Sequence, residues 1–217
     1  MSTQPMPTPV AALPAAAEYL VTIEEEREII LGWKRGDKRA YEALVRRYMS
    51  DAFGVAYGFV GNAEDARDLS QEAFIKAYHA RSRFDDGRPF YPWLYRILKN
   101  HCLNFLTRGR THVSIDDENE HREIASPGPT PLDQMESDER RRVVRAAIDR
   151  LSEDHREIIV LKNFREHSYR EIADILEIPV GTVMSRLFYA RQALRGLIEE
   201  IERTGLDAGA PGAREVI

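Results

Sequence analysis

The fold predicted for this 217-residue chain is all-α, with two small helical domains joined by a flexible acidic linker. Three observations predict it. Apolar residues recur at intervals of three and four along most of the chain, which is the period of an amphipathic helix. A stretch rich in proline and acidic residues divides the chain near its middle. Two short amphipathic segments joined by a tight turn follow near the C-terminal end, and they predict a helix-turn-helix.

The order of the segments divides the chain into five regions. Residues 1–23 are rich in proline and alanine and lack helical periodicity, so we expect a mobile extension. Residues 24–108 are expected to form the first helical domain, and residues 135–203 the helix-turn-helix domain. Residues 109–134 form the linker between them, and residues 204–217 are expected to be a short mobile tail.

The first domain is expected to contain four helices. The first covers residues 24–34 and the second 38–60, ending at Gly61, which suits a helix C-terminus. Asn62 is a suitable N-cap for a third helix that runs to about residue 81. Turn-forming residues at 85–89 interrupt the pattern, and a fourth helix, dense in aromatic and basic side chains, covers residues 90–107.

The second domain begins with helices over residues 135–150 and from Ser152 to about residue 163. Ser168 and Glu171 then form a capping box for a short helix over residues 169–176. Pro179 suits the first turn of the next helix, over residues 180–195. Apolar residues bury one side of that helix, and the other side carries hydroxyl, tyrosine and arginine side chains suited to base edges and phosphates. The alternative is a helical hairpin with an ordinary solvated basic face.

The charge of the chain is segregated. The formal net charge of −5 has the wrong sign for a protein that binds DNA unaided by its positive field. Residues 81–110, however, carry seven basic side chains against two acidic ones, and residues 113–140 carry nine acidic against two basic. Basic and acidic functions are therefore expected in different parts of the chain.

An acidic strip is predicted on the third helix. Asp65, Asp68 and Glu72 fall on one helix face with Gln71 beside them, next to an apolar ridge that starts at Leu69. Such a strip suits a basic helical partner. The alternative is an ordinary solvated acidic face.

Several classes of protein are excluded by the pattern. The single cysteine, Cys102, rules out an internal disulfide framework and is expected to be a small core residue. The six histidines show no zinc-ligand spacing, so no metal or cofactor is expected. We find no phosphate loop or nucleophile motif of an enzyme. The apolar runs are too short to span a bilayer and no signal peptide is visible, so we expect a cytoplasmic protein without membrane insertion.

Three motifs occurring in this order resemble the extracytoplasmic-function (ECF) group of bacterial sigma factors. They are Asp-Ala-Arg-Asp-Leu-Ser-Gln-Glu-Ala-Phe from Asp65, Phe-Tyr-Pro-Trp-Leu-Tyr-Arg-Ile from Phe90, and Pro-Val-Gly-Thr-Val-Met-Ser-Arg-Leu from Pro179. The resemblance covers about residues 25–200. It implies an alternative sigma factor that binds core RNA polymerase, reads the −35 element of a promoter as duplex and opens the −10 element to initiate transcription.

The resemblance implies a role for each motif. The first would bind the clamp helices of the polymerase through Asp65, Asp68, Leu69, Gln71, Glu72 and Phe74. The second, with the loop before it, would bind −10 DNA through Arg81, Arg83, Phe84, Arg88, Tyr91, Trp93, Arg96, Lys99 and Asn100. Aromatic rings beside cations suit strand opening, because a flipped base needs a stacking surface and its backbone needs positive charge. The alternative is a core role, which we favour for Tyr95 and Phe105 and leave open for Phe84, Phe90, Tyr91 and Trp93.

The third motif would place a helix in the major groove of the −35 element. The residues implied are Thr182, Val183, Met184, Ser185, Arg186, Tyr189 and Arg191. The chain departs from the family pattern at Met184 and Tyr189, where relatives often carry a basic residue, so its −35 preference is expected to differ. For Arg186, a cap or an ion pair within the domain is the alternative.

Partners follow from the same resemblance. They are core RNA polymerase, through the clamp helices and the flap of its two large subunits, promoter DNA, and an anti-sigma factor that holds the protein inactive. The acidic linker would pass through the polymerase channels, or it would be only a solvated tether. The competing function is an autonomous helix-turn-helix regulator, which would bind duplex DNA without polymerase as a dimer.

Overall fold

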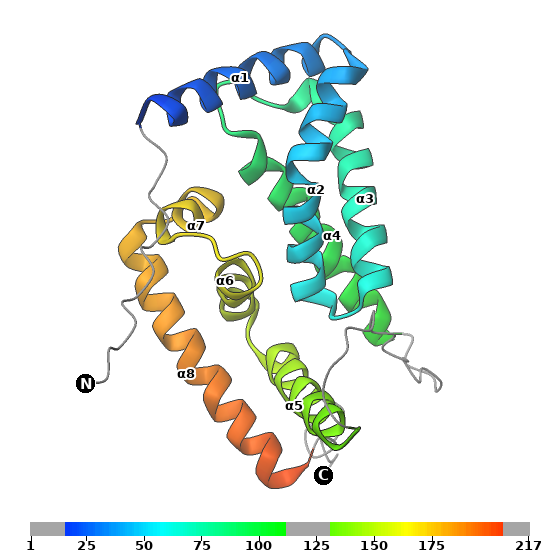
Figure 1. Ribbon diagram of the computed structural model, residues 1–217, viewed down its shortest axis with the longest axis vertical. Helices are drawn as coiled ribbons and strands as arrows, with labels where there is room; N and C mark the ends of the chain where they lie inside the picture. Colours follow the sequence, from blue (N-terminus) through cyan, green and yellow to red (C-terminus); the bar gives the residue numbers. More distant parts are fainter. Residues whose placement is uncertain (1–15, 112–130, 206–217) are drawn as a thin grey trace, which may run out of the picture.

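The computed structural model describes residues 16–111 and 131–205, with side chains described for residues 24–108 and 139–205. Within these residues the chain forms eight α-helices and one short 3-10 helix, and no strand. The all-α prediction is confirmed. Figure 1 shows the helices in two groups that lie against each other, one from each side of the undescribed segment 112–130.

The N-terminal half consists of α1 (Ala16–Lys34), α2 (Lys38–Val60), α3 (Ala63–His79), the 3-10 helix η1 (Arg81–Arg83) and α4 (Phe90–Thr111). Helices α2, α3 and α4 pack on one another, and α1 lies across one end of them (Figure 1). Side chains fix the helix starts, since Asp37 caps α2 and the side-chain oxygen of Asn62 accepts from two backbone N–H groups of α3. Gly61 ends α2 in the left-handed conformation, with φ of 75°.

The C-terminal half consists of α5 (Pro131–Arg150), α6 (Glu153–Asn163), α7 (Tyr169–Leu176) and α8 (Val180–Thr204). Ser152 caps α6, and the predicted capping box of Ser168 and Glu171 is present at α7. Glu177 ends α7 at a φ of 54°, and Pro179 is the N-cap of α8. We expected Pro179 within the first turn of this helix, but it lies one residue before that turn.

Some predicted boundaries were wrong. Helix α1 begins at Ala16, inside the segment expected to be mobile, and α8 continues to Thr204, beyond the predicted end of the recognition helix. Helix α4 extends to Thr111 and α5 begins at Pro131, so both ends of the predicted linker are helical. The remaining parts of the predicted extension, linker and tail (residues 1–15, 112–130 and 206–217) lie outside the described residues.

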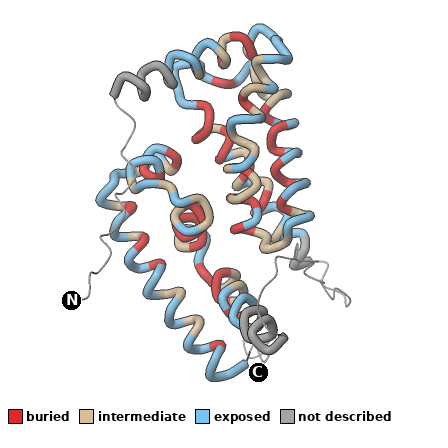
Figure 2. The backbone as a smooth tube through the Cα atoms, viewed as in Figure 1, coloured by how far each residue is buried: buried red, intermediate tan, exposed pale blue. Residues whose placement is uncertain are grey.

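The two halves share one hydrophobic core. A single cluster of buried residues includes Phe59 of α2, Leu94 of α4, Ile158 of α6 and Leu187 of α8. Figure 2 shows buried residues along both groups of helices. A second, smaller cluster of Val143, Ala147 and Ile201 joins α5 to α8. The two predicted helical domains therefore pack their apolar faces against each other. No helix in the described residues is long and apolar enough to cross a membrane.

Candidate nucleic-acid and partner interface

The polar residues of the predicted acidic strip on α3 reach the surface. Asp68, Gln71 and Glu72 are exposed, whereas Asp65 is half-buried beside the N-cap of its helix. One carboxylate oxygen of Glu72 lies 2.6 Å from Nε2 of His101 on α4. The exposed carboxylates therefore form a compact acidic surface that is available to a basic partner.

The apolar members of the same motif lie under this surface. Leu69 and Phe74 are buried in the core and have almost no exposed area. They position α3 and cannot contact a partner directly in this structure. Sequence analysis missed Ile75, which is 57% exposed and lies four residues after Gln71, hence on the same helix face. The spacing of four residues between Gln71 and Ile75 could have predicted that both side chains lie on the same helix face.

The aromatic residues before and within α4 form a cluster around Trp33 of α1. Phe84, Phe90 and Trp93 lie with their ring centroids 5.6, 5.4 and 5.9 Å from that of Trp33. Phe84 and Phe90 are buried and Trp93 is half-buried. Only Trp93 thus retains part of its surface, and Phe84 offers no free ring face to a base in this structure.

Three further aromatic residues of α4 differ in burial. Tyr95 is buried, as expected, and Tyr91 is buried as well, with its ring centroid 5.8 Å from that of His167 in the C-terminal half. Phe105 was expected in the core, but it is 39% exposed, so that expectation was wrong. Helical spacing places Phe105 on a face of α4 that no other described helix covers fully.

The polar and basic residues of the predicted −10 surface are mostly exposed, and several of them have partners within the chain. Arg83 and Asn100 are exposed, whereas Arg81 is half-buried and its guanidinium lies over the Tyr78 ring at 5.0 Å. The loop before α4 is tied to α1, because Lys34 Nζ lies 3.0 Å from Asp86. This hydrogen bond and charge lower the pKa of the Asp86 carboxyl.

The other three cations of this surface contact acidic residues of the C-terminal half. Arg88 and Arg96 lie 3.2 and 3.0 Å from the same carboxylate oxygen of Glu177. Lys99 Nζ lies 2.9 Å from Glu157 and 3.1 Å from Glu153. Burial alone would lower the pKa of Lys99, but the hydrogen bonds and charges of these two carboxylates outweigh it and raise the pKa, so the ammonium stays charged.

The predicted recognition helix, α8, presents most of its candidate residues to solvent. Met184, Ser185, Tyr189 and Arg191 are exposed, and Thr182 is half-buried. These side chains lie outside the buried face of the helix. A base edge or a phosphate therefore has access to them.

Two candidates on α8 lie elsewhere. Val183 is fully buried, so its place among the DNA-contacting residues was wrong and it anchors the helix instead. Arg186 Nη2 lies 3.6 Å from Asp154 of α6, the ion pair within the domain that we left open as an alternative. Sequence analysis missed Phe188, which is 65% exposed and whose ring centroid lies 5.4 Å from that of Tyr189.

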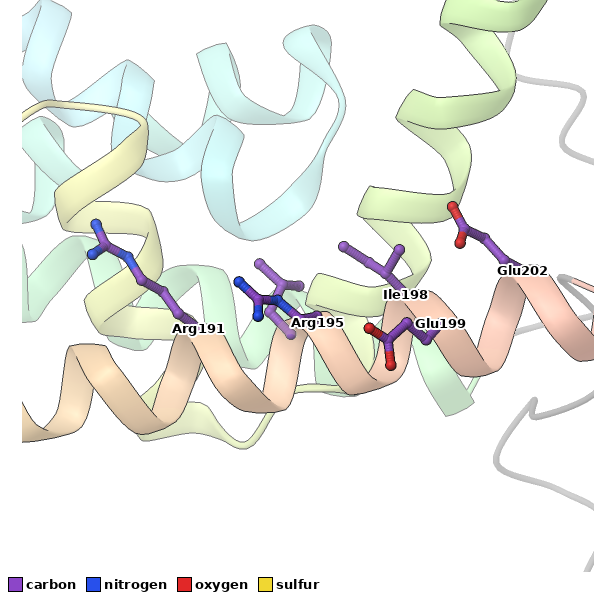
Figure 3. A pocket seen from close by; sticks show the side chains of 6 residues that line it. Arg191, Arg195, Ile198, Glu199 and Glu202 are labelled. Atoms are coloured by element: carbon purple, nitrogen blue, oxygen red, sulfur yellow. The ribbon is translucent and has the colours of Figure 1, made fainter.

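A groove lies further along α8. Figure 3 shows side chains of Arg191, Arg195, Ile198, Glu199 and Glu202 around it, on the side of α8 that faces α5. Its volume is about 420 Å³. Within the described residues, no group of three histidine, cysteine or carboxylate side chains is placed to hold a metal ion.

Both halves match known protein families. The sigma-70 region 2 family matches residues 44–111, and the sigma-70 region 4 family matches residues 141–194. The chain is 38% identical over 195 residues to the RNA polymerase sigma-H factor of Pseudomonas aeruginosa, with 85% of this chain and 99% of that protein covered. It is 39% identical over 177 residues to the ECF RNA polymerase sigma-E factor of Escherichia coli K12, with 78% of this chain and 92% of that protein covered.

Solved structures of similar proteins have the same fold. CnrH in complex with the cytosolic domain of CnrY superposes with a TM-score of 0.58 at 26% identity, covering 81% of this chain and 97% of CnrH. The sigma factor RpoE of Bartonella quintana, in complex with the anti-sigma factor NepR, superposes with a TM-score of 0.51 at 25% sequence identity. The match covers 73% of this chain and 96% of RpoE. Because the matches extend over both halves, an autonomous helix-turn-helix regulator is not supported. The chain belongs to the ECF group of RNA polymerase sigma factors, which bind promoter DNA and initiate transcription.

Proposed function

We propose that this sigma factor uses its two halves for separate steps of promoter recognition. The N-terminal half, residues 24–108, binds core polymerase and opens the −10 element, and the C-terminal half, residues 135–203, reads the −35 element. The observation that carries the proposal is the separation of charge on exposed helix faces. Carboxylates gather on α3, whereas cations gather from η1 through α4 and along α8 as far as Arg195.

The polymerase contact is assigned to the exposed part of the α3 strip. Asp68, Gln71 and Glu72 offer a polar acidic surface, and the exposed Ile75 adds an apolar contact beside them. An interface with a basic helix gains long-range attraction from such carboxylates and close packing from an isoleucine. Leu69 and Phe74 keep the helix in place from below.

The DNA contacts are divided between α4 and α8. Arg83, Arg88, Arg96, Lys99 and Asn100 are proposed for the −10 strand, with Trp93 as the aromatic ring that retains exposed surface. On α8, the exposed set around Met184 and Tyr189 reads the −35 duplex. A sigma factor with net charge −5 relies on polymerase for nonspecific DNA affinity, so it should bind free promoter DNA weakly.

Regulation by an anti-sigma factor is part of the proposal. It is supported by the similarity to the Bartonella quintana sigma factor that was solved with an anti-sigma factor. We further propose that the protein acts in the cytoplasm and has no catalytic activity of its own, in keeping with its place in a family of transcription initiation factors.

The test of the polymerase contact is Asp68→Arg combined with Glu72→Arg. Charge reversal at both exposed positions should abolish binding to immobilised core polymerase and leave the helical circular dichroism signal unchanged. The matched control is Glu24→Arg with Glu28→Arg on α1, which reverses two exposed carboxylates at the same spacing. Normal holoenzyme assembly by the α3 variant would refute the assignment.

A further inference from the structure

A histidine of α4 lies between two charged side chains of α3. The two helices pack side by side in the N-terminal half (Figure 1). His101 Nε2 lies 2.6 Å from one carboxylate oxygen of Glu72, and His101 Nδ1 lies 2.7 Å from Nζ of Lys76. Both ring nitrogens therefore have a partner, and both partners belong to the helix that carries the acidic strip.

These contacts determine which ring nitrogen carries the proton. A lysine ammonium has donors and no acceptor, so Nδ1 accepts from Lys76 and carries no hydrogen. The proton of the neutral ring is then on Nε2, which donates it to Glu72. Lys76 Nζ also lies 3.4 Å from Nε2, but this is the longer contact and Nε2 has no free lone pair once it is protonated. A chain of hydrogen bonds thus runs from Lys76 through His101 to Glu72.

The ring separates two side chains that are spaced to pair with each other. A glutamate four residues before a lysine on a helix is in the favourable order for an ion pair. In the described part of the chain Glu72 and Lys76 make no direct ion pair, and both contact His101 instead. The carboxylate of Glu72 is therefore not neutralised by direct contact with the ammonium of Lys76.

The hydrogen bond from His101 restrains an exposed carboxylate. The side chain of Glu72 is 57% exposed, whereas that of His101 is only 16% exposed. A free glutamate samples several rotamers, and fixing it during binding weakens an interface by about two- to tenfold. The second carboxylate oxygen of Glu72 has no hydrogen-bond partner in the described residues, so it can accept from a partner protein. The mostly buried ring thus fixes Glu72 before a partner binds.

Glu72 differs in this respect from its exposed neighbours on the strip. Asp68 and Gln71 are also exposed, but their side chains have no hydrogen bond or ion pair within the described residues. The position of Glu72 is therefore controlled by a second helix, whereas theirs is not.

We infer that His101 is a positioning residue for polymerase binding, and that its ring holds the Glu72 carboxylate in the geometry that a basic helix of core polymerase contacts. The inference rests on the proposed polymerase contact of α3. It adds a residue of α4 that acts through Glu72 and does not touch polymerase itself.

The hydrogen-bond chain is tested in the free protein by ¹⁵N NMR of the histidine side chains. The shifts of the ring nitrogens distinguish a protonated Nε2 from a protonated Nδ1. The signals of His101 are identified by their absence in His101→Gln. At about pH 8, where an ordinary histidine is neutral, we expect the Nε2–H form. A predominant Nδ1–H form would overturn the inference.

The positioning role is tested by the affinity of the full chain for immobilised core polymerase. His101→Phe keeps a ring but removes both nitrogens, so it should weaken binding by about two- to tenfold. His101→Gln should restore most of the affinity, because its amide can donate to Glu72 and accept from Lys76. The matched control, His155→Phe, should bind normally, since the half-buried ring of His155 has no hydrogen-bond partner in the described residues.

The background variant Glu72→Ala separates positioning from a general structural role. If the ring acts through Glu72, His101→Phe should cause no further loss of affinity in a chain that already carries Glu72→Ala. Three results would each overturn the inference: normal affinity of His101→Phe, no rescue by His101→Gln, or the same loss with and without Glu72.

Glu72→Ala alone distinguishes failure of this inference from failure of the proposed function. It should weaken binding to core polymerase. If it does so while His101→Phe binds normally, the polymerase contact stands and the positioning role is wrong. If Glu72→Ala binds normally, the proposed contact at Glu72 is itself wrong, and the inference is wrong with it.

Discussion

Replacing Lys99 with methionine should destabilise the folded chain by about 2 kcal/mol. The hydrogen bond to Glu157, whose side chain is 6% exposed, joins two charged groups, and a buried contact of this kind is worth about 1.5–3 kcal/mol. The second contact, to Glu153, is with a side chain that is 53% exposed, so it contributes only about 0–1 kcal/mol. Lys99 itself is 19% exposed, so water can partly replace it, which favours the lower part of the combined range.

The assay is urea unfolding of the full chain, followed by circular dichroism and tryptophan fluorescence. Lys38→Met is the control, because Lys38 is exposed at the start of α2, and it should change the free energy of unfolding by no more than about 0.5 kcal/mol. Glu157→Gln completes a double-mutant cycle in which we expect a coupling energy of about 1 kcal/mol or more. The reasoning fails if Lys99→Met matches the control, or if the coupling is within about 0.3 kcal/mol of zero.

Three further predictions follow from the same structure. Arg186→Ala should weaken discrimination for the −35 sequence by about 1–3 kcal/mol if the guanidinium contacts a base, and an unchanged preference of the holoenzyme in a promoter competition assay would assign it a structural role. Ser168→Ala removes the cap of α7 and should cost about 1 kcal/mol in urea unfolding, whereas Ser185→Ala, within the exposed face of α8, should cost less. Burial lowers the pKa of His167 below its ordinary value of 6.5, so the unfolded chain binds more protons and stability falls as the pH drops below 6.5. His167→Gln should reduce this loss between about pH 7 and pH 5, and an identical pH slope in the variant would contradict the assignment.

The features predicted well from sequence are those that depend on residues close to one another along the chain. Helix starts at Asn62, Ser152 and Ser168 depend on a side chain that bonds to the backbone two or three residues later, so they can be read from a short window. Helical spacing also predicts the burial of Val183, together with Leu187 and Ala190, and all three are buried. Val183 was nevertheless placed among the DNA contacts because the resemblance assigned the whole motif to the major groove.

The features that sequence analysis missed depend on contacts between distant residues. Helical spacing assigns Phe105 to a face of α4 but does not say whether another helix covers that face. Glu157 and Glu177 resemble ordinary helix and turn residues, yet their partners in the N-terminal half lie from 58 (Lys99 to Glu157) to 89 (Arg88 to Glu177) residues away along the chain. The contact between the two halves depends on such pairs and on Gly58 of α2, whose lack of a side chain matters only beside Val160 of α6.

The most direct test of the account is transcription in vitro from a promoter library, with purified protein in the presence and absence of bacterial core polymerase, alongside a DNA-shift assay. The account predicts promoter-specific transcripts and complexes only when protein and polymerase are combined. Tight, specific binding of duplex DNA by the protein alone, with no effect of added polymerase, would contradict it.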